Sequence, residues 1–324
     1  MGIEPTRRKT APQIAVMGSG AVGCFYGGML ARAGSRVTLI GRAQHVDAIR
    51  QVGGLRFDAL DFSEVVPVAA TSDPAAVRGA KWVLFAVKSI DTEEAAQLIA
   101  PHLDPDALVI GLQNGVDNLE RIRRHLPNPV LAAVVYVAVA MAAAGKVRHT
   151  GRGDLIIGNM GGEALPAARL DEIASKFQEA GVPCQVSGNV EGELWLKLLM
   201  NCAYNAVSAL GRSQYKRMAA SPDVLAVMRM AVREVLDVAH VAGVEMPPGD
   251  LVEAACRLAD AMPEAISSTA QDLARGKRTE IDHLNGFVVR LGQSLEVPTP
   301  VNQTLHALVK LLEANASSVP QAGA

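Results

Sequence analysis

The feature that most constrains this chain is a glycine-rich turn near its N-terminus, with the sequence Gly18-Ser19-Gly20-Ala21-Val22-Gly23. An apolar run precedes the turn over residues 13–17, and a helical pattern follows it to about Ala33. In that context Gly-x-Gly-x-x-Gly is the fingerprint of a dinucleotide-binding βαβ unit. The first glycine allows a tight turn, the second lets the backbone approach a pyrophosphate, and the third lets the helix pack closely on the strand. We therefore predict that residues 18–23 bind a dinucleotide at the helix N-terminus, where backbone N–H groups point at the phosphates.

The end of the second predicted strand, Arg36–Ile40, indicates which dinucleotide is bound. Chains that bind NAD usually carry Asp or Glu there, which accepts a hydrogen bond from the ribose 2′-hydroxyl. This chain has Arg42 instead, and a guanidinium group can fork onto a 2′-phosphate. Lys88, directly after the predicted strand 82–87, adds a second positive charge at the carboxyl edge of the sheet. The two cationic residues therefore favour NADPH and NADP as the cofactor.

The order of the predicted elements indicates an α/β fold in the N-terminal part of the chain. Predicted strands end at Ile40, Val87 and Leu112 with helical patterns between them, which is typical of a Rossmann-type doubly wound sheet. The Val-rich run from Val130 to Ala144 suits a strand that is buried on both faces of a parallel sheet. Further short strands are predicted at 146–150, 155–158 and 183–186.

The character of the sequence changes near Gly188. Beyond it, β-branched strands give way to long helical patterns at 191–210, 222–242, 249–261, 278–295 and 300–314. We therefore predict an NADP-binding Rossmann domain over residues 1–188 and an all-helical substrate and catalytic domain over residues 189–324. Residues 1–12 resemble a disordered tail, and the chain beyond Asn315 resembles a frayed end.

Composition excludes several classes of function. The formal net charge is −2 over 324 residues, which gives no case for binding nucleic acid or an anionic membrane. The four cysteines lie far apart and the seven histidines show no ligand spacing, so we predict neither a metal site nor a disulfide framework. These properties favour a cytoplasmic protein that acts on a small molecule. The apolar helices of the C-terminal part favour a homodimer.

The predicted helix over residues 191–210 is apolar almost all round, which is typical of a buried helix. Lys197, Asn201 and Asn205 recur on it every four residues and so form one polar stripe. Burying a lysine and two amides without partners is costly, so we expect the stripe to face a polar cleft. A lysine in such a place can deliver a proton, and asparagine amides can hold a hydroxyl or a carboxylate.

Three further polar sites admit more than one interpretation. Asn114 follows the predicted strand 107–112 at the carboxyl edge of the sheet, where a nicotinamide ring is expected, but Asn-Gly is also a common turn. The segments 267–272 and 279–282 are rich in Ser, Thr, Asp and Glu. By themselves they fit helix caps and surface residues as well as they fit a site.

Taken together, these motifs resemble those of the ketopantoate reductase (2-dehydropantoate 2-reductase) family. The similarity spans both predicted domains in the expected order and rests on Gly18–Gly23, Ala86–Lys88, Gln113–Gly115, Trp195–Asn205, Ser267–Asp272 and Thr279–Gly286. The glycine turn alone would not be specific, whereas the Lys-Asn-Asn stripe combined with Thr-Glu-Ile-Asp is.

The resemblance implies an NADPH-dependent reduction of a small 2-keto acid, namely 2-dehydropantoate to (R)-pantoate in the biosynthesis of pantothenate and coenzyme A. It implies that Lys197 is the general acid and that Glu280 contacts both cofactor and substrate. It assigns the nicotinamide end of the cofactor to Asn114 and to the backbone near Ala138. Implied substrate contacts come from Asn114, Lys197, Asn201, Asn205 and Ser268.

Two positions depart from the family pattern. An asparagine expected just before the serine pair is Ala265 here, and another, expected after the lysine helix, falls near Tyr215. Both positions concern recognition of the substrate and not hydride transfer. The reaction class is therefore better supported than the identity of the 2-keto acid.

Two other functions stay open from the sequence. A β-hydroxyacid or 6-phosphogluconate-type dehydrogenase also pairs a lysine with an asparagine four residues on. A phosphosugar would need an arginine cluster, however, for which Arg212 and Arg217 are weak candidates. A non-catalytic NADP(H)-binding sensor would keep the glycine turn and Arg42 but would need neither the Lys-Asn stripe nor Glu280.

Overall fold

The computed structural model describes residues 13–162 and 164–318. The predicted N-terminal tail and the last six residues of the predicted frayed end, 319–324, lie outside the described residues. The chain forms two compact units. The first unit comprises the residues through Gln113 together with Asn118–Gly188, and the second comprises Asn114–Asp117 together with the residues from Asn189 on. The short loop Asn114–Asp117 therefore belongs to the helical unit, although it follows a strand of the sheet in sequence.

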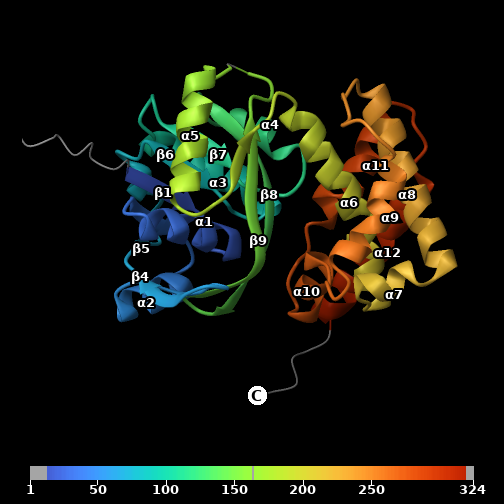
Figure 1. The fold of residues 1–324 in the computed structure, drawn as a ribbon, viewed down its shortest axis with the longest axis horizontal. Coiled ribbons are helices and arrows are strands. Elements are labelled where there is room, and N and C mark those ends of the chain that lie inside the picture. The colour runs from blue at the N-terminus through green and yellow to red at the C-terminus, as the bar shows by residue number, and fades with distance from the viewer. Residues whose placement is uncertain (1–12, 163, 319–324) are drawn as a thin grey trace, which may run out of the picture. The chain divides into compact units, whose positions relative to one another are not determined.

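The first unit is built on a 10-stranded sheet (Figure 1). Its strands are β1 (Gln13–Met17), β2 (Arg36–Ile40), β3 (Leu55–Asp58), β4 (Ser63–Val66), β5 (Ala69–Thr71), β6 (Trp82–Phe85), β7 (Leu108–Gly111), β8 (Val130–Ala143), β9 (Lys146–Gly158) and β10 (Cys184–Val186). Its helices are α1 (Ala21–Arg32), α2 (Ala43–Val52), α3 (Thr92–Ile99), α4 (Asn118–Arg123) and α5 (Ala167–Glu179), with short 3₁₀ turns η1 (Pro74–Val77), η2 (Ser89–Asp91) and η3 (Ala100–His102).

The strand order confirms the predicted doubly wound core. From one edge it runs β5-β2-β1-β6-β7-β8, and all of these neighbours pair in parallel. On one side of β1 lie β2 and then β5, and on the other lie β6, β7 and β8 in chain order. Strands β3 and β4, which come between β2 and β5 in the chain, lie beyond β9 at the opposite edge. The order thus reverses at β1 and β6, and ligands of open α/β sheets bind at the carboxyl ends of the strands beside such a switch point.

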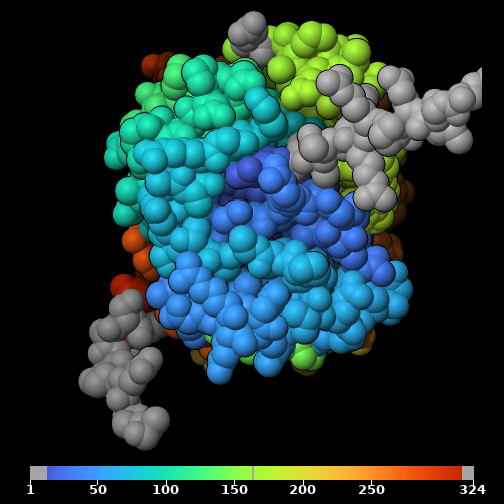
Figure 2. Space-filling model, turned by 90° about the vertical axis from the view of Figure 1, so that its left-hand side faces the viewer, coloured from blue at the N-terminus to red at the C-terminus, as the bar shows by residue number. Residues whose placement is uncertain are grey.

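Both faces of this core are buried, as the apolar runs in the strands predict. Alternate residues of β1 enter different clusters: Ile14 and Val16 pack with residues of α1 and α5, whereas Ala15 and Met17 pack with residues of α3 and α4. Such alternation follows from the two-residue period of a strand. The N-terminal segments of this unit, in blue and cyan, form the face seen in Figure 2.

The prediction for the run Val130 to Ala144 was only partly right. Only the first residues of β8, Val130 to Ala132, pair in parallel with β7, while most of the strand pairs antiparallel with β9 and carries three register shifts. Burial is complete over 131–135 and then declines, so that the far end is exposed. The two short strands predicted at 146–150 and 155–158 are one strand, β9, because the long β8 partner carries the pairing across the gap.

The second unit is entirely helical in its regular elements (Figure 1). They are α6 (Val190–Gly211), α7 (Tyr215–Ala219), α8 (Pro222–Val241), α9 (Leu251–Ala261), α10 (Ser268–Ala274), η4 (Ile281–His283), α11 (Asn285–Ser294) and α12 (Pro300–Ser318). The long helix predicted at 278–295 is wrong: Leu284, at φ −112° and ψ −105°, separates η4 from α11. Helix α12 also extends past the predicted end at residue 314.

Buried polar contacts fix the position of α6 in this unit. Asn285 donates to the carbonyl of Cys202 on α6 and to Asn302 on α12. Glu234 of α8 accepts the backbone N–H groups of Val301 and Asn302 and so caps α12 from outside. A carboxylate is favourable at a helix N-terminus because the orphan N–H groups and the helix dipole both attract it.

Two further properties of the described residues concern the apolarity of the helices and the state of the cysteines. Among the described residues, none of the helices has the length and apolarity that crossing a membrane requires. The four cysteines, all within the described ranges, are free thiols. Burial raises the pKa of Cys24 and Cys184 to about 12, so neither is a reactive thiolate.

Candidate functional site

The glycine turn has the geometry that its three glycines predict. Gly18 has φ +112°, and a Cβ there would lie 2.6 Å from backbone atoms of Ala86 and Val87. A Cβ on Gly23 would lie 2.0 Å from the carbonyl oxygen of Gly18, which shows how closely α1 packs on the turn. A Cβ on Gly20 would meet no atom within 4 Å, so this glycine faces open space. The middle glycine is thus the one that leaves the backbone accessible to a phosphate.

Hydrogen bonds narrow down which amides can bind a phosphate. The N–H groups of Gly18 and Ser19 both donate to the carbonyl of Ile40, at 2.9 and 3.1 Å. Ser19 is buried, and its hydroxyl packs where a Cβ of Gly41 would otherwise lie. The remaining donors of the turn are those of residues 20–23 at the N-terminus of α1, which have no acceptor within the helix, because its first bond runs from the Cys24 N–H to the Gly20 carbonyl. The cradle is therefore smaller than the six-residue motif suggests.

Three further residues that were predicted to bind the cofactor lie on the first unit. Arg42 precedes α2, and its side chain is 86% exposed, with Nη2 3.7 Å from Oδ2 of Asp91. Asp91 makes this contact and does not cap α3 through its side chain. Lys88 is exposed just beyond β6, which ends at Phe85, before the predicted end. Ala138 lies at a register shift of β8, where its carbonyl accepts from Thr150 Oγ1 at 3.3 Å.

The second unit brings together three of the predicted residues. Lys197 Nζ donates to Asn114 Oδ1 at 2.9 Å, and Asn114 Nδ2 donates to Glu280 Oε2 at 3.2 Å. Because the amide oxygen faces an ammonium group and the amide nitrogen faces a carboxylate, the orientation of Asn114 is fixed. Glu280 is only 8% exposed, and Lys197 is half-buried. A proton donor and a carboxylate are thus held on either side of one amide.

A second contact joins the same two loops. Asp117 Oδ2 lies 3.5 Å from His283 Nδ1, and both side chains are mostly buried. The loop 114–117 is therefore attached to the segment 280–283 at both of its ends. Sequence patterns gave no signal for this pair, because the two residues are far apart along the chain.

The sequence patterns also did not predict a network of charged residues around Thr279 and Asp282, on either side of Glu280 in the chain. Thr279 N–H donates to Glu313 Oε1 at 2.6 Å, and Asp282 accepts from His306 and Lys310 at 2.7 and 2.9 Å. Burial by itself raises the pKa of Asp282, but the hydrogen bonds from His306 and Lys310 outweigh it and hold the pKa below its usual value. The Thr-Glu-Ile-Asp motif was the one sequence feature that pointed to this segment. Its first and last residues, Thr279 and Asp282, anchor the segment, and its glutamate contacts Asn114.

The remaining predicted residues differ in placement. Asn201 is half-buried on α6, and Asn205 is 4% exposed. Ser268 begins α10 and is exposed, whereas its neighbour Ser267 is buried, caps α10 and donates to the carbonyl of Asn205 at 3.1 Å. Ser267 thus anchors the segment to α6.

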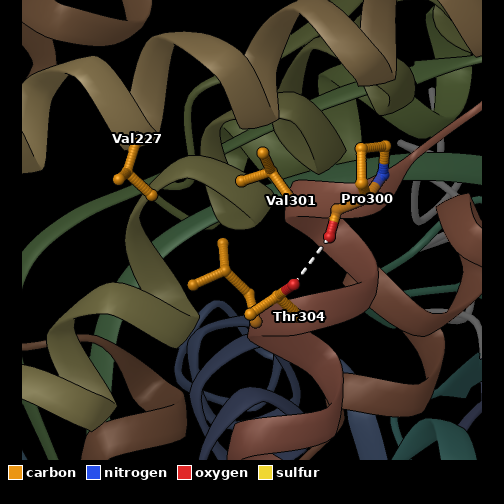
Figure 3. Close-up of a pocket in the computed structure, with 5 residues that line it drawn as sticks. Val227, Pro300, Val301 and Thr304 are labelled. Atoms are coloured by element: carbon orange, nitrogen blue, oxygen red, sulfur yellow. Dashed lines mark hydrogen bonds between the residues drawn. The ribbon is translucent and has the colours of Figure 1, made fainter.

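A surface depression of about 270 Å³ lies elsewhere in the second unit (Figure 3). It is lined by Val227 of α8 and by Pro300, Val301, Thr304 and Leu305 of α12. The only polar side chain in this lining is that of Thr304, whose hydroxyl donates to the carbonyl of Pro300 at 2.8 Å. The depression holds none of the predicted site residues and offers no chemistry.

Comparison with known proteins identifies the family of the chain. The family model described as "Ketopantoate reductase PanE/ApbA" matches residues 14–162, and that described as "Ketopantoate reductase PanE/ApbA C terminal" matches residues 189–313. The chain belongs to the ketopantoate reductase family.

Individual proteins extend over the same length. A 2-dehydropantoate 2-reductase of Halobacterium salinarum is 33% identical over 304 residues, which are 93% of this chain and 99% of that protein. The crystal structure of a PanE/ApbA family ketopantoate reductase from Ralstonia eutropha matches with a TM-score of 0.89 and 52% identity, covering 94% of this chain and 99% of the other. A D-mandelate dehydrogenase solved with NADH and anilino(oxo)acetate matches with a TM-score of 0.86 and 25% identity, covering 94% and 99%.

The two positions at which this ketopantoate reductase family member departs from the pattern lie next to each other. Tyr215 N–H donates to the carbonyl of Ala265 at 3.0 Å. The Tyr215 ring packs on Tyr204, with ring centroids 4.4 Å apart, and burial raises the pKa of Tyr215 to about 12. Two separate departures in the sequence are therefore one local change in the structure.

Proposed function

We propose that this chain reduces 2-dehydropantoate to (R)-pantoate with NADPH, a step in the biosynthesis of pantothenate and coenzyme A. The observation that carries the proposal is the hydrogen-bonded series Lys197–Asn114–Glu280, found in a chain of this family that also has an open dinucleotide turn. A cofactor-binding sensor would need the turn but not the series.

The residues present fit a dinucleotide, because the turn is closed at Gly18 and Gly23 and open at Gly20. Backbone amides of residues 20–23 would bind the pyrophosphate, with the whole motif Gly18–Gly23 shaping the loop. Arg42 and Lys88 would bind the 2′-phosphate, and Asn114, Glu280 and the backbone of Ala138 would bind the nicotinamide end. When bound, NADPH supplies a hydride to the keto carbon.

The protein residues supply the proton. As the keto carbon gains a hydride, its oxygen becomes an alkoxide, and the Lys197 ammonium transfers a proton to that oxygen and is reprotonated from solvent. A positioned general acid contributes roughly 10²–10⁴-fold to the rate. Asn114 holds the ammonium group in place by accepting a hydrogen bond from it, and Glu280 holds Asn114 by accepting a hydrogen bond from its amide nitrogen. Asn114, Asn201, Asn205 and Ser268 would contact the carboxylate and hydroxyl of the substrate.

This assignment gives each unit a separate role. The first unit is the NADP-binding domain, and the second is the substrate and catalytic domain, with a boundary at residue 188 and with the loop 114–117 contributed to the second. The protein would act on a small 2-keto acid without nucleic acid or membrane partners.

The decisive test is substitution of the lysine. Lys197→Ala should lower kcat by roughly 10²–10⁴-fold and leave the NADPH dissociation constant nearly unchanged. Lys277→Ala, which removes an exposed lysine of the same unit, is the matched control and should behave as wild type. Wild-type turnover in Lys197→Ala would overturn the proposal.

A substrate panel distinguishes the alternatives. It should contain 2-dehydropantoate, other aliphatic and aromatic 2-keto acids with NADPH and NADH, and 3-hydroxy acids with NADP. Turnover of 3-hydroxy acids alone would indicate a β-hydroxyacid dehydrogenase. NADPH binding without turnover of any compound would indicate a sensor. Either result would contradict the proposed reaction.

We also propose that the protein is a cytoplasmic homodimer. Free, mostly buried thiols suit a reducing compartment, and exposed apolar side chains such as Leu308, Leu311 and Met230 suit a subunit interface. Light scattering should give about twice the chain mass of 34.1 kDa, and a monomer mass would refute the dimer. Cell fractionation tests the compartment.

A further inference from the structure

A buried polar network lies at the carboxyl edge of the sheet in the first unit, and the proposed reaction gives it no role. It consists of Ser89, Thr92, Gln113 and Asn118, of which none is more than 7% exposed. We call this set the junction network. Two members come from the segment after β6 and two from the segment that follows β7, so the network joins the two segments.

Thr92 is the centre of the junction network. Its hydroxyl accepts from Gln113 Nε2 at 2.8 Å and lies 2.9 Å from the carbonyl of Ser89 and 3.1 Å from Asn118 Oδ1. A hydroxyl has one proton, so it donates to one of these two oxygens at a time. Asn118 Nδ2 in turn donates to Ser89 Oγ at 3.2 Å. These bonds hold the four side chains in place relative to one another, although Gln113 Oε1 is buried without a hydrogen-bond partner.

The junction network clamps the backbone on both sides of Lys88. Gln113 Nε2 donates to the carbonyl of Val87 at 3.0 Å, and the hydroxyl of Thr92 reaches the carbonyl of Ser89. Gln113 is also the residue directly before Asn114. One side chain thus connects the loop that carries Lys88 with the backbone from which Asn114 starts.

We propose that Thr92, acting through Gln113, is a positioning residue for the reaction, setting the place of Lys88 and of Asn114 together. This inference rests on the proposed function, in which Lys88 binds the cofactor and Asn114 orients the general acid. Loss of the Thr92 hydroxyl then weakens cofactor binding and slows the chemical step at once, although Thr92 touches neither reactant.

The test compares Thr92→Val, which removes the hydroxyl at nearly constant shape, with Thr92→Ser, which keeps it. Thr92→Val should raise the NADPH dissociation constant and lower kcat at saturating NADPH, each by about tenfold, the factor that corresponds to roughly one hydrogen bond. Thr92→Ser should stay within about twofold of wild type for both quantities. If Thr92→Val folds poorly, Gln113→Met serves in its place. This substitution removes the same contact from the other side and should have the same effect on the NADPH dissociation constant and on kcat.

Asn128→Ala is the matched control for a purely structural effect. Asn128 is a buried residue of the same unit, and its amide donates to the carbonyls of Asp104, Pro105 and Ala107 at the opposite end of β7. It should lower the urea midpoint without changing either kinetic quantity. The proposal is overturned if Thr92→Val binds and reacts as wild type, or if the losses in all variants simply follow their loss of stability.

The NADPH dissociation constant and kcat also test this inference separately from the proposed function. NADPH binding is followed by fluorescence without any keto acid. A wild-type protein that binds NADPH but reduces no 2-keto acid would refute the proposed reaction, while the change in dissociation constant would still decide whether Thr92 positions the Lys88 loop.

Discussion

Replacing Asn114 by leucine is the perturbation that most directly examines the Lys197–Asn114–Glu280 series. Leucine has nearly the shape of asparagine but neither donates nor accepts a hydrogen bond. The substitution therefore removes the 2.9 Å bond from Lys197 Nζ and the 3.2 Å bond to Glu280 Oε2. Both partners remain in the protein, but the amide that fixes their places is gone.

The expected magnitude follows from the type of bond. A hydrogen bond to a charged group contributes about 1.5–3 kcal/mol. If the loss of one such bond is felt in the transition state, kcat/KM for the 2-keto acid falls by about 10- to 150-fold. The fall should appear mainly in kcat, because the amide positions the proton donor.

The assay is a double-mutant cycle of steady-state rates with Asn114→Leu, Lys197→Met and the combined variant. If Asn114 acts by holding Lys197, its substitution should have little further effect once the lysine is absent. The kcat of the double variant should then be within about threefold of that of Lys197→Met. Urea unfolding of each variant should first establish that the second unit remains folded.

Two results would refute this reasoning. One is a kcat for Asn114→Leu equal to that of wild type. The other is a loss of kcat in the double variant that equals the product of the losses in the two single variants, because residues that act independently give additive free energies.

Three further outcomes are expected. Arg42→Ala should raise the KM for NADPH by about ten- to a hundredfold and barely change that for NADH, and steady-state kinetics showing equal losses would contradict the 2′-phosphate assignment. Ala265→Asn should lower the KM for 2-dehydropantoate by about three- to tenfold if a lost hydrogen bond is restored, whereas an unchanged KM means that other residues hold the substrate. Because contacts with His306 and Lys310 lower the pKa of Asp282, its charge stabilises the fold above the unfolded-state pKa of about 4, and this contribution is lost as the pH falls through the folded value. The free energy of unfolding, measured with urea, should therefore fall more between pH 5 and 3 for wild type than for Asp282→Asn. An equal pH dependence would show that the Asp282 charge does not stabilise the fold.

Local sequence determined the glycine turn and the strands of the first unit. A tight turn, an open middle glycine and a close helix contact are each set by the absence of a side chain at one position, so the roles of Gly18, Gly20 and Gly23 follow from their spacing alone. Period-two burial of strands and the four-residue period of Lys197, Asn201 and Asn205 are equally local. These signals predicted the fold class and one catalytic candidate.

Tertiary structure alone decided how the site is assembled. Asn114 meets Lys197 across 83 residues of chain and Glu280 across 166 residues, and no periodicity carries information over such separations. The predicted helix at 278–295 is interrupted at Leu284, and Asp282 within that stretch is held by residues of α12. Ser267 and Ser268 are adjacent and chemically identical, yet one is buried as a cap and the other is exposed, because only packing against α6 distinguishes them. The candidate site residues were found through local sequence patterns, whereas the contacts that orient them depend on packing between residues far apart in the chain.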